Sequence, residues 1–551
     1  MSIELEQNRT RRRKARAAVA PACALLLCLA AAVRGEEAAN TARLRLLSRI
    51  EPGVGGAEII DYDAERALLV STLSGGVAVV SLENPAAPIA VRTVRFSDAD
   101  LPAGGGGLDG VSSVATDPVG RGFAAAALIP RKTAAGRGSV VFFRLETGEI
   151  LASLPVGFHP DAVAFSHDGR FALIANEGEY RRRGAQTEGS LTVVDLSGVD
   201  ETNDVKSLDP SSATTYPFAP EYFGTGASPE GLRRHDAESA PTLAHSLEPE
   251  YVSEAGGRVY VSLQENNALA VFDLGQRKWL RFFDLGTIRQ RIDASDRDGA
   301  FGGAAAKIDD EVAGLPMPDT IKAFMWDGKP CVITANEGDA RAGDSGDAMR
   351  IKHAGRAGPP LDPAVRRRLK TALGADPLMD HALGRLEIST VDGDIDGDGD
   401  IDLPTMFGTR SISVWDGETG ERLFDSGSFF EEYALARDPQ TFNMNRGNPE
   451  RRDTRSDNKG PEIEAVAVAE WDGTLWYAAA AERQNGLFLF RAEQPDRPEL
   501  YAYANPRGAG DTAPECLRFV PAEERKDGRT LLIAGFEASE TILIFEIDGT
   551  N

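Results

Sequence analysis

One strand pattern recurs seven times along this 551-residue chain and constrains the fold more than any other feature. Each copy has a short apolar strand followed by a segment in which apolar and polar residues alternate, as they do in half-buried strands. The alternating segments are 76–83, 138–145, 189–196, 267–274, 410–415, 486–491 and 540–547. The apolar strands before them are 67–72, 123–129, 171–175, 259–264, 331–335, 475–480 and 531–535.

Repeated sheets of three or four strands, without a helical pattern between them, are typical of a β-propeller. We therefore predict an all-β fold, a seven-bladed β-propeller that occupies residues 36–551. The last repeat ends at Ile547 and has no fourth strand after it. Residues 42–50 precede the first repeat, and we predict that they supply this strand. That pairing would close the ring and cover a sheet edge that otherwise stays open.

Long insertions interrupt the repeats at about 200–247, 286–316, 340–409 and 428–459. The first is polar and rich in Pro and Ser, and the second carries charges of both signs. The third contains a predicted helix near 362–373 and a run of Asp residues. Long loops on a rigid repeat scaffold often carry function.

The first 35 residues are predicted to be a signal peptide. A basic segment from Arg9 to Arg16 precedes an apolar stretch from Ala17 to Val33. This order is more typical of a signal peptide than of a membrane anchor, because so short a stretch barely spans a bilayer. An uncleaved anchor is the alternative. We expect an exported protein in the periplasm, on the cell surface or outside the cell, with no transmembrane span in the mature chain.

The formal net charge of −25 limits the partners of this protein. So acidic a surface repels nucleic acid and anionic lipid and attracts cations, which predicts divalent cations as partners. The sequence has no G-x-S-x-G elbow, P-loop or H-E-x-x-H motif. Its six His residues are scattered without the spacing of a zinc site, which argues against a zinc hydrolase.

An Asp-rich run, DGDIDGDGDID, spans Asp392–Asp402. Aligned from Asp394, it has acids at alternate positions and Gly399 at position 6, as calcium loops do. The predicted side-chain ligands are Asp394, Asp396, Asp398 and Asp402, with Asp400 at the position that usually binds through its carbonyl. No helical pattern flanks the run, so this would be a calcium loop outside an EF-hand. The alternative is a solvated acidic turn.

A second set of acids recurs at the ends of the repeats. Acids at the start of a repeat are Glu58, Asp161, Glu250, Asp319, Glu462 and Glu515. Acids after an apolar strand are Glu177, Glu265, Glu337, Glu482 and Glu537. The first strand of every propeller blade lines the central channel, so we expect these acids to converge around one axis. Such close carboxylates must bind cations, pair with Arg or Lys, or take raised pKa values.

These acids predict a metal centre in the channel. The proposed ligands are Glu250, Glu337, Glu462 and Glu515. Calcium is the expected ion, with another divalent metal as the alternative. A repeated turn signal, in which Pro and an acid cap a strand, would also explain part of the pattern.

Four cationic residues lie beside these acids in the sequence: Arg341, Arg410, Lys459 and Arg483. They could hold a phosphate or another anion. They could equally be structural ion-pair partners, and the sequence leaves both interpretations open.

Several longer motifs resemble those of a known family. They are LEPEYVSEAGGRVYVSLQENNALAVFDL from Leu247, VITANEGDAR from Val332, RSDNKGPEIEAVAV from Arg455 and APECLRFVP from Ala513. On these motifs the chain resembles the choice-of-anchor I family of bacterial exported proteins over about residues 42–547. The family also includes mesenchyme-specific cell-surface glycoproteins linked to animal biomineralisation. One departure from the family pattern is Ile463, which stands where the second Pro of Gly-Pro-Glu-Pro-Glu is usual.

Two functions follow from these observations. We favour an exported calcium-binding protein of the cell envelope or extracellular space, with a non-enzymatic binding or mineral-associated role. Some family members are described as atypical alkaline phosphatases, which implies the alternative, a calcium-dependent phosphomonoesterase with its metal site in the channel. Its candidate catalytic residues would be Glu462, Glu464, Lys459, Arg341 and Arg483. The partners would be phosphate-containing small molecules or envelope components.

Overall fold

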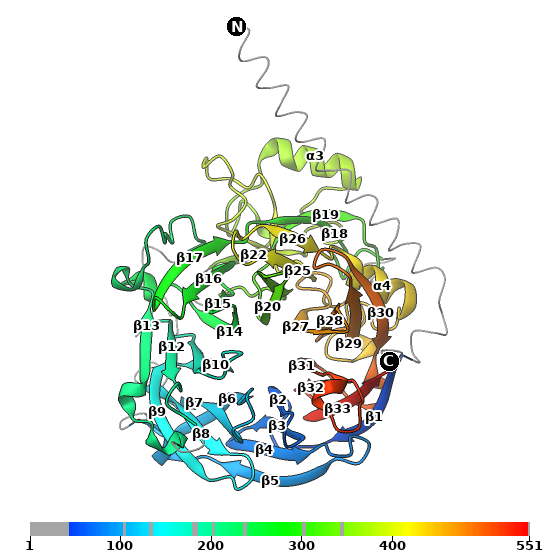
Figure 1. Ribbon diagram of the computed structural model, residues 1–551. Coiled ribbons are helices and arrows are strands. Elements are labelled where there is room, and N and C mark those ends of the chain that lie inside the picture. Colours follow the sequence, from blue (N-terminus) through cyan, green and yellow to red (C-terminus); the bar gives the residue numbers. More distant parts are fainter. Residues whose placement is uncertain are drawn as a thin grey trace.

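The computed structural model describes residues 43–102, 106–131, 136–178, 186–200, 204–234, 240–299, 305–341 and 346–548. The predicted signal peptide lies outside these residues. Within them the chain is an all-β protein, as predicted, and most of its strands belong to four-stranded antiparallel sheets. Figure 1 shows these sheets side by side around a common centre, with the first strand of each sheet innermost.

Most four-stranded sheets are built from four strands that follow one another along the chain. The first three sheets are β2 (Ile60–Asp63), β3 (Leu68–Leu73), β4 (Gly76–Ser81) and β5 (Ile89–Arg95); β6 (Leu108–Thr116), β7 (Phe123–Pro130), β8 (Arg137–Arg144) and β9 (Ile150–Phe158); and β10 (Pro160–Phe165), β11 (Phe171–Asn176), β12 (Ser190–Asp195) and β13 (Ala213–Pro217). The next two are β14 (Pro249–Ala255), β15 (Arg258–Leu263), β16 (Ala268–Asp273) and β17 (Lys278–Asp284); and β20 (Ile321–Trp326), β21 (Lys329–Asn336), β25 (Ser411–Asp416) and β26 (Arg422–Asp425). The remaining two are β27 (Ile463–Trp471), β28 (Thr474–Ala481), β29 (Gly486–Ala492) and β30 (Pro498–Ala504); and β31 (Pro514–Val520), β32 (Leu531–Phe536), β33 (Thr541–Ile547) and β1 (Leu44–Ile50). There are two exceptions to this order: an insertion separates β21 from β25 within one sheet, and the N-terminal strand β1 completes the last sheet.

The core lies between neighbouring sheets. Second and third strands are buried almost throughout because both of their faces are covered by adjacent sheets, as in β28, whose apolar run ends in four Ala residues. Small side chains here let the sheets approach closely. One apolar cluster joins the first sheet to the last, since it contains Leu69 of β3 and Ile533 of β32, both without measurable exposure. Each such fully buried aliphatic side chain contributes about 1.5–3 kcal/mol.

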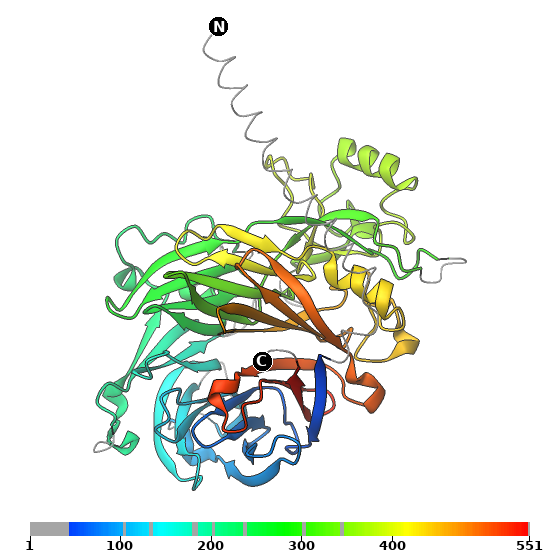
Figure 2. The same ribbon diagram turned by 45° about the vertical axis from the view of Figure 1, so that its right-hand side comes forward.

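The N-terminal strand β1 completes the last sheet. It pairs antiparallel with β33, from Leu44 opposite Ile547 to Ile50 opposite Ile542. This is the pairing predicted from the missing fourth strand. Figure 2 shows β1 in dark blue beside the red strands of the chain's end. The pairing covers the edge of β33, an apolar strand that would otherwise expose unpaired backbone groups.

The insertions carry structure of their own. Residues 200–247, predicted as an insertion, include β13 and so supply the fourth strand of their sheet. The other insertions hold β18 (Ile288–Ile292), β19 (Asp310–Leu315), β22 (Ala348–Arg350), β23 (Glu387–Ser389), β24 (Thr405–Phe407), α3 (Pro363–Leu373) and α4 (Phe429–Arg437). Strands β18, β19 and β24 form one small sheet, and β22 pairs with β23. Single turns of 3₁₀ helix lie in connections, at Asp98–Asp100, Val205–Ser207, Pro210–Ser212, Pro220–Tyr222, Leu243–His245, Ile351–His353, Pro449–Arg451, Pro506–Ala509 and Ala522–Glu524.

The predicted helix near 362–373 is present as α3. It begins after Asp362, whose carboxylate accepts the backbone N–H groups of Ala364 and Val365, and Pro363 occupies its first turn. It ends at Gly374, which has a φ of +69° and therefore takes a left-handed conformation that favours glycine. Figure 2 shows the lobe that carries α3 projecting from the ring of sheets.

Candidate metal centre

An acid stands at a β-bulge near the start of several first strands. In β10 the pairing register shifts between Pro160 and Ala162, which leaves Asp161 as the extra residue. The same kind of shift makes Glu515 the extra residue in β31 and Glu464 the extra residue in β27. Because a bulge re-aims the extra side chain, it frees these carboxylates from the alternation of their strands.

Two further first strands carry acids at the same kind of shift. In β14 the pairing register shifts between Pro249 and Val252, and Glu250 lies between these two residues. In β6 the shift lies between Leu108 and Gly110, so Asp109 is the extra residue. Sequence reasoning missed the exposed Asp109 because no Pro precedes it and no acid follows β7.

Three groups of carboxylates form where these bulges meet the ends of the second strands. In each group, one oxygen from every residue lies within 4.8 Å of the others. The groups are Asp161, Glu177 and Glu250; Asp319, Glu337 and Glu464; and Glu482, Glu515 and Glu537. Every group therefore combines acids from the start of a first strand with acids just after a second strand. The expected convergence of the two sets of acids is present in these residues.

Burial, together with repulsion between neighbouring acids, raises the pKa values of several carboxyl groups in these clusters. Burial, followed by repulsion from Glu177 and Asp161, raises the pKa of Glu250 well above its usual range. Burial and the neighbouring acids Glu337 and Glu515 do the same to the pKa of Glu464. A cluster of this kind cannot ionise fully in the absence of cations. Each group is therefore either partly protonated or occupied by positive charge.

The cations beside the groups are engaged with acids. Lys459 forms an ion pair with Glu337. The Arg341 guanidinium donates to Glu248 over 2.7 Å. These contacts match the structural ion-pair interpretation of the two side chains.

Arg483 is also engaged, and it bridges two acids. Its Nε donates to Glu462 and its Nη1 to Glu482, each over 2.6 Å. Glu462 is fully buried and also pairs with Arg455. The Glu462 carboxylate is thus held between two Arg side chains directly before β27.

Glu462 therefore lies outside the three carboxylate groups, although the sequence suggested it as a ligand. The register explains the difference. Ile463 pairs with Ala481 in the way that Pro160 pairs with Asn176, so Ile463 takes the position of the proline in this sheet. The acid that follows it, Glu464, then occupies the bulge. Glu464 is 8% exposed, and its Oε2 has no hydrogen-bond partner among the described residues.

The predicted acids Glu58 and Glu265 also lie outside the groups. Glu58 is exposed as a whole, but partial desolvation of its carboxyl, followed by repulsion from Asp161 and Glu537, raises its pKa to about 7. Burial and Glu248 raise the pKa of Glu265 well above its usual range. In both cases, repulsion from neighbouring carboxylates contributes to the raised pKa.

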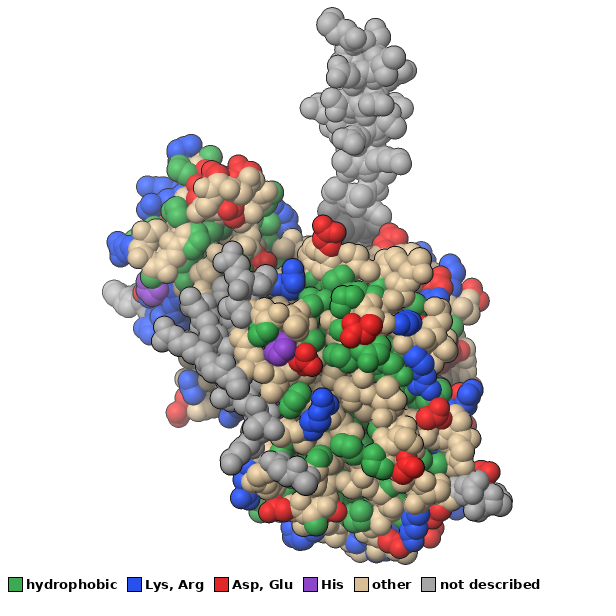
Figure 3. Space-filling model, turned by 90° about the vertical axis from the view of Figure 1, so that its left-hand side faces the viewer, with side chains coloured by type: hydrophobic (Ala, Val, Ile, Leu, Met, Phe, Trp, Pro, Cys, Tyr) green, Lys and Arg blue, Asp and Glu red, His purple; other side chains and the backbone are tan. Residues whose placement is uncertain are grey.

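The Asp-rich run forms an exposed turn in which Asp394, Asp396 and Asp402 bring carboxylate oxygens within 4.8 Å of one another. Asp394 accepts the backbone N–H groups of Gly397 and Gly399, at 2.7 and 2.9 Å, so the chain curls around this carboxylate. Figure 3 shows acidic side chains gathered on the projecting lobe.

Asp398 and Asp400, the other predicted ligands of this loop, are not members of that three-residue group. Burial and the neighbouring Asp398 raise the pKa of Asp400 to about 6. The loop therefore offers three converging carboxylates, fewer than the sequence pattern predicted.

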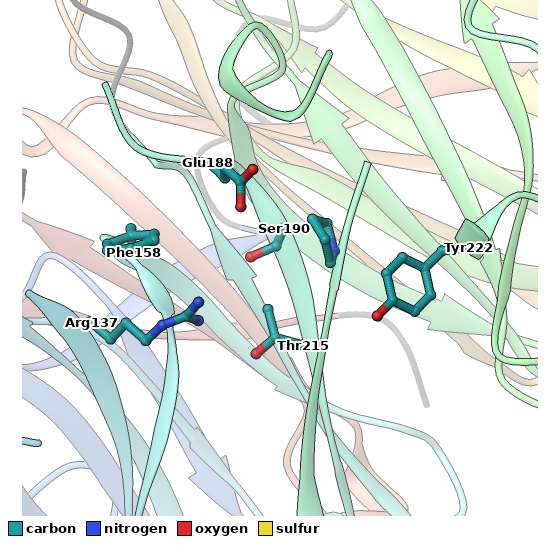
Figure 4. A pocket seen from close by; sticks show the side chains of 7 residues that line it. Arg137, Phe158, Glu188, Ser190, Thr215 and Tyr222 are labelled. Atoms are coloured by element: carbon teal, nitrogen blue, oxygen red, sulfur yellow. The ribbon is translucent and has the colours of Figure 1, made fainter. Parts of the chain in front are cut away.

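A small pocket of about 230 Å³ lies between the outer parts of two sheets (Figure 4). It is lined by Arg137, Phe158, Glu188, Ser190, Thr215, Pro217 and Tyr222. The Arg137 guanidinium stacks over the Phe158 ring at 4.9 Å, which fills part of the space. The lining residues belong to none of the carboxylate groups.

Four-stranded antiparallel sheets arranged around a centre that is rich in carboxylates define a propeller-like all-β protein. A family model described as the choice-of-anchor I domain matches residues 58–495, which is most of the chain. The chain belongs to the choice-of-anchor I family, and this confirms the assignment made from its sequence motifs. Membership of this family indicates a surface-associated or exported protein. Among the described residues, we find no helix with the length and apolar character needed to span a bilayer.

Similar proteins are distant in sequence. Gigasin-3a of Magallana gigas is 27% identical over 191 residues, which cover 31% of this chain and 67% of that protein. The hydrazine synthase of Kuenenia stuttgartiensis is 9% identical, with a TM-score of 0.42 over 91% of this chain and 98% of that chain. A chain of the mitotic checkpoint complex is also 9% identical, with a TM-score of 0.41 over 93% of this chain and 96% of that chain.

Proposed function

We propose that this protein is an exported calcium-binding β-propeller of the cell envelope or extracellular space, with a non-enzymatic binding or mineral-associated role. The observation that carries this proposal is the convergence of three groups of three carboxylates from different sheets. Calcium ions at these groups would neutralise the repulsion that raises the pKa values of Glu250 and Glu464. The mineral-associated role rests on the resemblance to glycoproteins linked to biomineralisation.

The proposed propeller has seven blades in a ring that β1 closes. The innermost strands support this arrangement because each contacts the innermost strand of the next sheet. These contacts join β2 to β6, β6 to β10, β10 to β14, β14 to β20, β20 to β27, β27 to β31, and β31 back to β2. In such a ring the bulge acids of successive blades face one channel.

The chemistry of the groups favours calcium. Their members are all Asp or Glu, so they offer hard oxygen ligands without the nitrogen or sulfur donors that zinc prefers. Calcium binds oxygen at about 2.3–2.6 Å, so two ligand oxygens on opposite sides of the ion lie about 5 Å apart. Oxygens that lie within 4.8 Å of one another, as they do in each group, are compatible with this spacing.

The contacts of the nearby cations favour binding over catalysis. A phosphoryl-transfer site needs positive charge to hold the phosphate in addition to its metal ligands. Lys459 is paired with Glu337, and Arg483 is shared between Glu462 and Glu482. Because these charges are already neutralised by carboxylates, we assign them to the scaffold of the site.

The direct test is the conservative change Glu464→Gln, which removes one charge from one group and keeps the side-chain shape. Calcium binding to chelator-treated protein would be measured by titration calorimetry. We expect the affinity of one site to fall at least roughly tenfold, since calcium affinity follows the number of charged ligands. The matched control is Glu470→Gln, an exposed Glu on the same strand. Equal calcium number and affinity in parent, variant and control would contradict the proposal.

A phosphatase assay tests the alternative function. We expect calcium-loaded protein to hydrolyse an aryl phosphate at alkaline pH no faster than buffer does. Turnover that a chelator abolishes and that Glu464→Gln lowers would instead establish the phosphomonoesterase. Turnover that neither treatment changes would place the active site outside these carboxylate groups and contradict both functions.

A further inference from the structure

A second set of polar side chains, none of which belongs to the three carboxylate groups, lies where the insertions meet. Asp293 directly follows β18, Glu431 belongs to α4, and Asn443 and Asp453 lie in the segment after α4. All four residues are at most 1% exposed. Charged side chains are seldom buried so completely unless they are paired or bind a metal.

A chain of hydrogen bonds joins three of these residues directly. The Asn443 amide donates to Glu431 Oε1 over 2.6 Å and to Ser456 Oγ over 2.8 Å. Ser456 Oγ in turn donates to Asp453 Oδ1 over 2.6 Å. Two carboxylates and one carboxamide are thereby held together in the interior.

Asp293 is tied to the same cluster by Arg410. One guanidinium nitrogen, Nη1, donates to the Asp293 backbone oxygen over 2.8 Å and to Glu431 Oε1 over 2.7 Å. Arg410 supplies one positive charge beside the carboxylates of Glu431 and Asp453. The Asp293 carboxylate itself accepts the backbone N–H groups of Ser295 and Lys307, over 3.2 and 2.7 Å.

Three oxygens of the cluster have no hydrogen-bond partner among the described residues. They are Glu431 Oε2, Asn443 Oδ1 and Asp453 Oδ2. Each shares its carbon with an atom of the hydrogen-bond chain, so the three oxygens lie close to that chain. An unpartnered buried polar atom costs about 1–3 kcal/mol, and more if it is charged. One donor of the cluster, Arg410 Nε, also has no hydrogen-bond partner in the part of the chain that the structure describes, so the unpartnered acceptors outnumber the unpartnered donors by three to one. This excess of acceptors points to an absent positive ligand.

We propose that Glu431, Asn443 and Asp453 form a buried calcium site that fastens α4 to the segment after it. Carboxylate and amide oxygens are the ligands that calcium prefers, and each of the three residues provides one that has no hydrogen-bond partner within the described chain. The ion would supply the positive charge that the three unpartnered oxygens lack. It would join helix α4 to the segment after it, and Arg410 links this cluster to the backbone after β18. This site is structural and independent of the proposed channel function.

The test compares calcium content after passage over a chelating resin, measured by elemental mass spectrometry. The variants Asp453→Asn and Glu431→Gln each remove one charged ligand and keep the side-chain shape. We expect both to retain one calcium ion fewer per chain than the parent does. The control Asp117→Asn changes another buried Asp, whose two oxygens are held by Arg121. It should leave the calcium count unchanged. Equal counts in the parent and all three variants would overturn the proposal.

A measurement on the parent protein covers the case in which the variants do not fold. Prolonged treatment with a chelator should expose the segment 438–460 to limited proteolysis, and added calcium should protect it again. Cleavage in this segment that is indifferent to calcium would refute the site. The Asp117→Asn variant should keep the protection, because Asp117 directly follows β6, which belongs to a different sheet.

Discussion

The change Arg410→Met tests how firmly the insertions are fastened to the sheets. Arg410 lies immediately before β25 and is 1% exposed. Its Nη1 donates to Glu431 and to the Asp293 carbonyl, and its Nη2 donates to the carbonyls of Ser456 and Asn458 over 2.8 and 2.6 Å. A methionine side chain fills similar space but makes none of these bonds. The variant therefore leaves a buried carboxylate and three carbonyl groups without this donor.

The expected cost follows from these contacts. Breaking a buried ion pair by removing one partner costs about 3–5 kcal/mol because the remaining charge is stranded. The entropy of unfolding is about 2.1 cal/mol/K per residue, or about 1 kcal/mol/K for a chain of about 500 residues. The melting temperature should then fall by about 3–5 °C if the chain unfolds as one unit.

Scanning calorimetry in excess calcium would measure this shift, with Arg491→Met as the matched control. Arg491 lies on β29, its side chain is 57% exposed, and it pairs with Glu499 at 3.7 Å. A surface pair of this kind contributes at most about 1 kcal/mol, so the control should melt within about 1 °C of the parent. Hydrogen exchange in α4 should also become faster in Arg410→Met alone. Equal melting temperatures and equal exchange in the two variants would refute the reasoning.

Three further predictions concern the sheet edge, the Asp-rich loop and pH. Deletion of residues 43–51 should expose the β33 edge and cause self-association in light scattering, and a monomeric variant with the parent's melting temperature would rule this out. The double change Asp394→Asn and Asp396→Asn should lower the calcium count by one, and an unchanged count would exclude this site. Calcium-free protein should become less stable as pH rises from about 4.5, the usual pKa of a Glu side chain, through about 7, the raised pKa of Glu58. The reason is that a raised pKa makes the folded state bind more protons than the unfolded state over this pH range. A higher melting temperature at pH 8 than at pH 5 in calcium-free protein would contradict this prediction.

The strands could be predicted because their signal is local. In an alternating segment such as 486–491, the order of residue types over a few positions indicates which side chains face a neighbouring sheet. The pairing of β1 with β33 was also predictable, since an apolar last strand requires a partner on its open edge. Helix α4 was missed because it is buried on most sides at Phe429, Phe430 and Tyr433, and so lacks the polar face of an ordinary surface helix.

The site was predictable only in outline. Pro461 and Glu462 form the Pro-acid pair that lies at the bulges of other first strands, such as β10 and β31. In β27, however, the acid at the bulge is Glu464, which follows Ile463. Sequence spacing cannot show a register shift of this size, because it depends on which residue pairs with Ala481. The buried cluster around Asp453 left no signal at all, since its members come from three segments that meet only in the folded chain.

The pairing of β1 with β33 also sets an order of events for folding. Leu44 lies near the start of the described residues and its partner Ile547 lies near their end, so this contact has almost the largest sequence separation possible among them. Contacts of this kind form late because a very long loop must close first. Most other sheets draw their strands from short stretches and can assemble as soon as those stretches are released during synthesis or export. The sheet of β31, β32, β33 and β1 must wait until residues 44–50 and 541–547 are both available, and the edge of β33 remains open until they pair.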